Sequence, residues 1–181
     1  VNQSPVADPM LRLITIWLDI CLLRAAPQEL PASRVLLWLS LAAYSLVSFF
    51  LSQAGHPSGL ALRMLGVDLA LLVVFAVVPL YLLDKSARIG QTLTALAGSG
   101  ALLGLIALPV IRVLFEGQAA GEVPPFAALL WLILFGWSLL VVAHIMRHAL
   151  SVTFPVGLGV AILYMLVAMQ MIGTVFPSEA N

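Results

Sequence analysis

One acidic residue, Asp68, lies inside the apolar run Gly66–Leu83. The run is long enough to cross the hydrocarbon core of a bilayer as a helix. A carboxylate at that depth costs several kcal/mol unless it is paired, protonated or facing water. The run therefore predicts a membrane-spanning helix, and it predicts that Asp68 faces a partner inside the protein.

The composition supports the same class of protein. Apolar residues make up 62% of the chain and charged residues only 9%, whereas a soluble domain carries roughly 25% charged residues. A chain of this size cannot bury so many apolar residues in its core, so its surface must face lipid. The formal net charge is zero, which favours no nucleic-acid partner. The single cysteine, Cys21, excludes an internal disulfide and a multi-cysteine metal site.

Five apolar stretches each meet the need for roughly 20 residues per span. They are Val35–Ser52, Leu60–Leu83, Ile89–Phe115, Pro125–Ile145 and Val152–Phe176. The third is longest, and we expect Pro109 to allow a tilt or kink there. The predicted fold is an all-α polytopic membrane bundle of five transmembrane helices. Its domains are an N-terminal segment over residues 1–34, the bundle over 35–176 and a short tail over 177–181.

An amphipathic helix is predicted ahead of the spans, over Met10–Arg24. Arg12, Thr15 and Asp19 form a narrow polar stripe at helical spacing, with apolar residues around the rest of the circumference. This pattern is typical of a helix that lies in the headgroup region, and the segment is too short and too charged to cross. Pro27 stops it.

The positive charges predict the orientation. With five spans, the N-terminal segment and the loops after the second and fourth spans share one side of the membrane. Six of the eight Lys and Arg residues lie on that side: Arg12, Arg24, Arg34, Lys85, Arg88 and Arg147; Arg63 and Arg112 lie on the other. The bias predicts a cytoplasmic N-terminus and an extracytoplasmic C-terminus in a bacterial inner membrane.

For Asp68 we expect an ion pair with Arg112. Both lie in the outer halves of adjacent antiparallel spans, whereas Arg63 points about 140° away from Asp68 around the same helix. The alternative interpretation is a proton or cation site, because intramembrane acids often mark transport pathways. Only Thr92, Thr94 and Ser99 are available as further polar steps on the next span.

A second cluster consists of His144, Arg147 and His148, near the end of the fourth span. Together with Trp131 and Trp137, it is our predicted surface for anionic lipid or for a partner. The alternatives are ordinary contact with headgroups and, since His144 and His148 share a helix face, a metal or haem site.

Small residues mark one face of the third span. Gly98, Gly100 and Gly104 allow a neighbouring backbone to approach closely, and we expect this face to pack within its own bundle. Gly157 and Gly159 suggest a similar role on the fifth span.

The layout resembles the Yip family of Ypt/Rab-interacting membrane proteins, as a bacterial-type member. The resemblance rests on Trp137-Ser138 followed by His144-Ile-Met-Arg-His-Ala-Leu-Ser151, and on Cys21-Leu-Leu-Arg-Ala-Ala-Pro27 ahead of the first span. It implies a non-catalytic membrane organiser and carries over no catalytic residue. The acidic, tyrosine-containing stretch of eukaryotic members is absent here, which argues against binding of Rab-type GTPases.

We therefore expect an integral membrane protein, not an enzyme, that organises or stabilises a membrane protein assembly through helix packing and lipid contacts. No nucleotide-binding loop, serine-hydrolase motif or zinc-ligand string is present, so no catalytic residue, metal or cofactor is predicted. The expected partners are membrane lipids and other integral membrane proteins. The rival hypotheses are a small transport or proton-conducting subunit using Asp68, and a redox-complex subunit with a histidine ligand.

Overall fold

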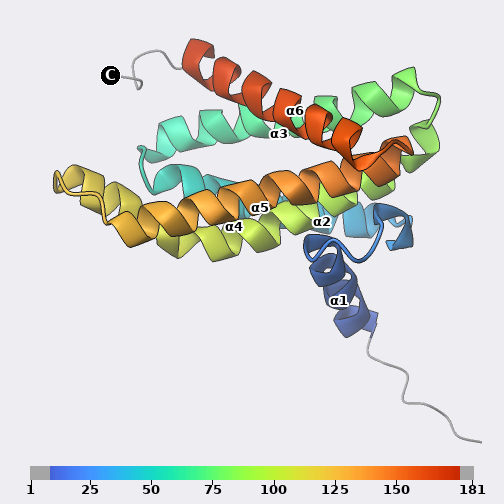
Figure 1. Cartoon of the computed structure of the whole chain (residues 1–181), viewed down its shortest axis with the longest axis horizontal. Helices are drawn as coiled ribbons and strands as arrows, with labels where there is room; N and C mark the ends of the chain where they lie inside the picture. Colours follow the sequence, from blue (N-terminus) through green and yellow to red (C-terminus); the bar gives the residue numbers. More distant parts are fainter. Residues whose placement is uncertain (1–8, 176–181) are drawn as a thin grey trace, which may run out of the picture.

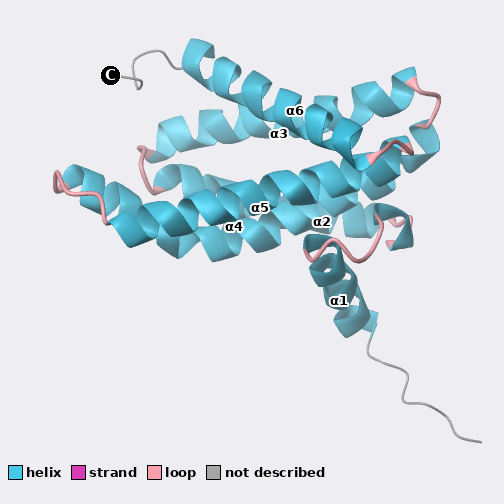
Figure 2. Ribbon diagram, in the orientation of Figure 1, coloured by secondary structure: helices cyan, strands magenta, loops and turns pink. Residues whose placement is uncertain are grey.

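The structure, a computed structural model, describes residues 9–175, so the predicted tail over 177–181 lies outside the described residues. Six α-helices and two short 3₁₀ turns make up the described chain, and no strand occurs in it (Figure 2). The predicted all-α class is confirmed. The elements are α1 (Pro9–Cys21), η1 (Pro27–Glu29), α2 (Arg34–Gln53), α3 (Ser58–Leu82), η2 (Ser86–Arg88), α4 (Ile89–Ala119), α5 (Pro125–Leu150) and α6 (Phe154–Val175).

The helices α2 to α6 are the five predicted spans. Each is long and apolar enough to cross a membrane, and consecutive spans run in opposite directions (Figure 1). The helix α4 continues through Pro109 and ends at Ala119 rather than Phe115. The helix α5 ends at Leu150 rather than Ile145, because side chains from other segments cap the carbonyl groups of its last turn. The five helices are compatible with an integral, multi-pass membrane protein.

The helix α4 is the centre of the bundle. Half of its most apolar window is buried, against 11–17% for the other four spans. Its small residues allow this central position. A methyl group added at Gly98 would meet the indole of Trp17, and one added at Gly100 would meet the ring of Tyr44. At Gly104 it would meet Val47. The small-residue face of α4 therefore packs against α1 and α2 within its own bundle.

The helix α1 does not run alongside the spans. It has 13 residues, docks its C-terminal half on the bundle and points away from it at a steep angle (Figure 1). On the docked side Ile20 and Cys21 are buried, whereas Ile14, Leu18 and Leu22 are each about half exposed. These exposed side chains form the apolar face that the sequence pattern assigns to the headgroup region, although the structure contains no membrane to place it.

Candidate functional site

Asp68 lies near the middle of α3, and its carboxylate meets hydroxyl groups rather than a cation. The Ser48 hydroxyl on α2 donates a hydrogen bond of 2.7 Å to Oδ2 of Asp68. Tyr44 is four residues before Ser48, so both side chains lie on one face of α2, and Tyr44 also interacts with the Asp68 carboxyl. The phenol of Tyr164 on α6 lies within electrostatic reach of the same group. The partners of Asp68 thus come from two other spans.

These contacts correct the expected ion pair between Asp68 and Arg112. The side chain of Asp68 turns toward α2, and among the described residues its partners are hydroxyl-bearing. Arg112 on α4 is exposed. The expectation failed because α3 packs against α2 as well as α4, so the helix next in sequence is not the one that Asp68 faces.

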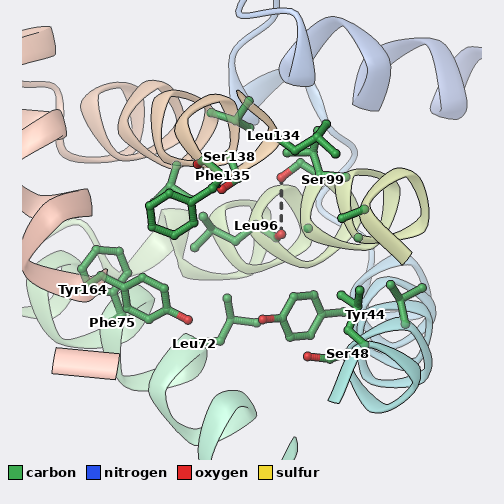
Figure 3. A pocket seen from close by; sticks show the side chains of 18 of the residues that line it. Tyr44, Ser48, Leu72, Phe75, Leu96, Ser99, Leu134, Phe135, Ser138 and Tyr164 are labelled. Carbon is green, nitrogen blue, oxygen red and sulfur yellow. Dashed lines mark hydrogen bonds between the residues drawn. The ribbon is translucent and has the colours of Figure 1, made fainter. Parts of the chain in front are cut away.

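A cavity of about 270 Å³ lies beside this cluster, and all five spans contribute to its wall (Figure 3). Ser48 and Tyr44 belong to the wall, so Asp68 lies one hydrogen bond behind it. Much of the remaining surface is aromatic. The rings of Phe75 and Tyr164 lie 4.4 Å apart between centroids, and those of Trp131 and Phe135 are stacked at 5.2 Å.

The second candidate region is the end of the bundle where the turns after α3 and α5 meet the N-terminal segment. Lys85 donates to the carbonyl of Leu150. The guanidinium of Arg88 donates to Ser151 Oγ at 2.6 Å, Ala149 O at 3.0 Å and His148 O at 3.3 Å. The last carbonyls of a helix have no partner within it and carry partial negative charge. Both cations are therefore used to cap α5.

The N-terminal segment is tied to α4 and α5 by side-chain amides and an indole. Gln28 donates to His148 O at 2.8 Å, and Gln91 donates to Leu30 O at 2.8 Å. The indole nitrogen of Trp137 donates to Cys21 O at 2.9 Å. These bonds hold η1 and the end of α1 against α4 and α5.

The structure corrects the predicted surface around His144. This side chain is 2% exposed, and its Nε2 lies 3.0 Å from the carbonyl oxygen of Ala25. It is covered because the N-terminal segment folds back over α5. Trp131 precedes Arg147 by 16 residues, which places it about 24 Å further along α5. The predicted residues therefore do not form one continuous patch.

Arg147 and His148 remain accessible and line an open groove of about 610 Å³, here called the basic groove. The other residues of the basic groove are Gln28, Arg88, Ser151, Val152, Thr153 and Phe154. Arg147 lies over the ring of Phe154 at 5.7 Å, and its buried Nε atom has no hydrogen-bond partner. The rings of His144 and His148 meet edge to face at 4.7 Å, and no group of three potential metal ligands occurs among the described residues.

The single cysteine, Cys21, is the last residue of α1 and is buried. Its Sγ lies 4.0 Å from the carbonyl oxygen of Ser99, and burial raises the pKa of the Cys21 thiol to about 11. Since the thiolate is the reactive form, this side chain is a packing residue and not a nucleophile.

Sequence reasoning missed the hydroxyl partners of Asp68. Tyr44, Ser48 and Ser52 recur every four residues in the first span, so they form a polar stripe on an otherwise apolar helix. That spacing was a usable signal. Tyr164 gave no such signal, because one tyrosine in an apolar helix is equally compatible with an interfacial anchor.

Comparison of the chain with protein-family models, with curated proteins and with solved structures gave no match.

Proposed function

We propose that the chain is a non-catalytic protein of the bacterial inner membrane that organises or stabilises a membrane protein assembly through helix packing and lipid contacts. The observation that carries this proposal is the basic groove, at the end of the bundle that holds the turns after α3 and α5. Most other polar side chains at this end are already used to hold the protein together. Lys85 and Arg88 cap α5, and His144 holds the N-terminal segment.

The chemistry of the groove favours the phosphate of an anionic lipid. Arg147 supplies guanidinium donors, and Ser151 and Thr153 supply hydroxyl groups. Arginine suits phosphate because its planar donors match the phosphate oxygens. The groove also lies at the end of the spans, where headgroups meet the protein, and Phe154 offers an apolar surface to the adjoining acyl region. A lipid held there would join the α5–α6 turn to η1 and so fix one face of the bundle.

The orientation follows the same reasoning. If the basic groove lies in the cytoplasmic leaflet, anionic lipids there attract it, and the N-terminus is cytoplasmic. The resemblance to the Yip family supports a membrane organiser of this kind. It supplies no partner, and we expect the partners to be other integral membrane proteins.

The lipid contact is tested on the purified full chain. Phosphatidylglycerol should raise the melting temperature where phosphatidylcholine does not, by about 2–4 °C for each kcal/mol of binding energy. Arg147→Gln should remove at least half of the rise, whereas the control Arg63→Gln, an exposed cation at the other end of the bundle, should keep it. Inorganic phosphate is the control for a soluble anion, because a groove that binds lipid should show a larger rise in melting temperature with phosphatidylglycerol than with phosphate. An unchanged rise in Arg147→Gln would contradict the proposal.

The assembly role has its own test. Purification in mild detergent followed by identification of co-purifying membrane proteins should recover one set of partners reproducibly. Substitutions of exposed side chains on α6, such as Leu163→Trp and Leu166→Trp, should release that set if α6 is the packing surface; both side chains are more than half exposed.

A second candidate function is favoured by the cavity beside Asp68. An intramembrane acid next to a cavity is the arrangement expected of a small transport or proton-conducting subunit.

A further inference from the structure

The carboxylate of Asp68 and the cavity next to it have properties that the lipid-binding proposal does not use. Asp68 is partly buried in the middle of a span, and none of its partners among the described residues is a cation. An ionised carboxylate in a medium of low dielectric constant is unfavourable without a positive partner. We infer that the cavity is a binding site for a small lipophilic ammonium ion, an organic molecule with one protonated amine on an apolar body.

The hydroxyl groups of the wall favour a ligand that donates hydrogen bonds. Ser48 gives its proton to Asp68 at 2.7 Å. Ser99 and Ser138 give theirs to the carbonyl oxygens of Ala95 and Phe135, each at 2.7 Å. Each hydroxyl has one proton and two lone pairs, so these three can offer a ligand only acceptor oxygens. A protonated amine can donate to these three serine oxygens.

The aromatic side chains favour a positive charge on that donor. Tyr44, Phe75 and Tyr164 all line the cavity, and Figure 3 shows Tyr44 on one side of Leu72 and Phe75 and Tyr164 on the other, with the tyrosine hydroxyls directed toward Leu72. Ring faces attract organic cations within about 6 Å, and the attraction is strongest where water is excluded. An ammonium ion in the cavity would favour the ionised form of the carboxylate behind Ser48, whereas a neutral ligand would not.

The dimensions of the cavity set the size of the ligand. Its volume of about 270 Å³ is just below the range of roughly 300–1,000 Å³ found for drug-sized ligands. The apolar part of the wall, including Leu72, Leu96 and Leu134, matches an apolar body. A single aromatic or short branched amine fits this description, and a whole phospholipid does not.

We expect a ligand to enter from the bilayer between α3 and α6. A second, outer groove there is lined by Leu71, Val78 and Leu163 among others, and it shares Phe75 and Tyr164 with the cavity. These two aromatic rings therefore form the wall between the cavity and the lipid-facing groove. We expect rotation of either ring to connect the two, so that a membrane-dissolved amine can enter the cavity without crossing the headgroup layer.

The test uses the full chain in detergent and two matched probes, 2-phenylethylamine and 2-phenylethanol, which differ in one polar group. Isothermal titration should show saturable binding of one amine per chain and at least tenfold weaker binding of the alcohol. Asp68→Asn should lower the affinity for the amine at least tenfold and leave that for the alcohol unchanged. Ala107→Phe should fill the cavity and abolish binding of both, whereas Leu105→Phe, a half-exposed position on the same helix, should not.

Ser48→Ala provides a second variant that keeps the carboxylate; it should retain a preference for the amine over the alcohol. Absence of saturable amine binding in the folded wild-type chain would overturn the inference. So would equal affinity for the two probes, or an Asp68→Asn variant that binds the amine as the wild type does. Displacement of the amine by millimolar Na⁺ in an Asp68-dependent manner would assign the site to an inorganic cation and would also overturn it.

Discussion

The two polar regions of the bundle hold charges of opposite sign, and each charge is bound by neutral polar groups. At the end that holds the basic groove, Lys85 and Arg88 bind the carbonyl groups that end α5. In the middle of the bundle, Asp68 binds the hydroxyl of Ser48. In both regions a charged group meets neutral dipoles. The end is open to water, where an unpaired cation costs little, whereas Asp68 lies at a depth where an unpaired anion is expensive. We therefore expect the capping contacts at the end to supply stability and the interior to supply binding of a small ligand.

The largest effect on stability should come from the end of the bundle. Arg88→Gln removes a guanidinium that donates to three oxygen atoms. Hydrogen bonds from charged groups contribute about 1.5–3 kcal/mol, so the free energy of unfolding should fall by about that amount. Reversible unfolding in mixed micelles measures it. The matched control is Arg63→Gln, which should change the value by less than about 0.5 kcal/mol. Equal effects of the two substitutions on the free energy of unfolding would contradict a stabilising role for the contacts of Arg88.

A smaller effect is expected inside the membrane. Asp68→Asn keeps an acceptor for Ser48 and removes a charge that has no cationic partner in the described chain. The free energy of unfolding should therefore change by less than about 1 kcal/mol, in contrast to the 3–5 kcal/mol lost when one half of a buried ion pair is removed. Arg112→Gln should be equally mild, and the double variant should equal the sum of the two within about 0.5 kcal/mol. A coupling energy above about 1 kcal/mol would indicate that Asp68 and Arg112 do form an ion pair.

The smallest expected effect is the reaction of the Cys21 thiol with maleimide in the folded chain. With a thiol pKa of about 11, on the order of one thiolate in a thousand is present at pH 8. Maleimide should therefore react negligibly with the folded chain at pH 8, and its rate should rise as the pH approaches 11. The same thiol should react fully after denaturation. Rapid labelling of the folded chain at pH 8 would show that α1 leaves the bundle.

The spans could be predicted from the sequence because their signal is local. Length and apolar content are enough to find a spanning helix, and the class of fold is confirmed. The partner of Asp68 could not be predicted in this way, because hydropathy does not say which helices are neighbours around the bundle. The burial of His144 depends on a segment more than a hundred residues earlier that folds back to bring Ala25 to it. The glycine face of α4 was readable because small residues have few other reasons to recur in an apolar helix.

The most direct test of the account is the sidedness of the two ends of the bundle. Single cysteines are placed at Ser86, in the turn after α3, and at Glu122, in the turn after α4; both positions are exposed, and Cys21→Ala removes the native thiol. A membrane-impermeant maleimide is then applied to intact cells and to opened ones. A five-span bundle with its basic groove in the cytoplasm predicts labelling at Glu122 in intact cells and labelling at Ser86 only after the membrane is opened. Labelling of Ser86 from outside, or of both positions from one side, would contradict a five-span protein whose basic groove faces the cytoplasm.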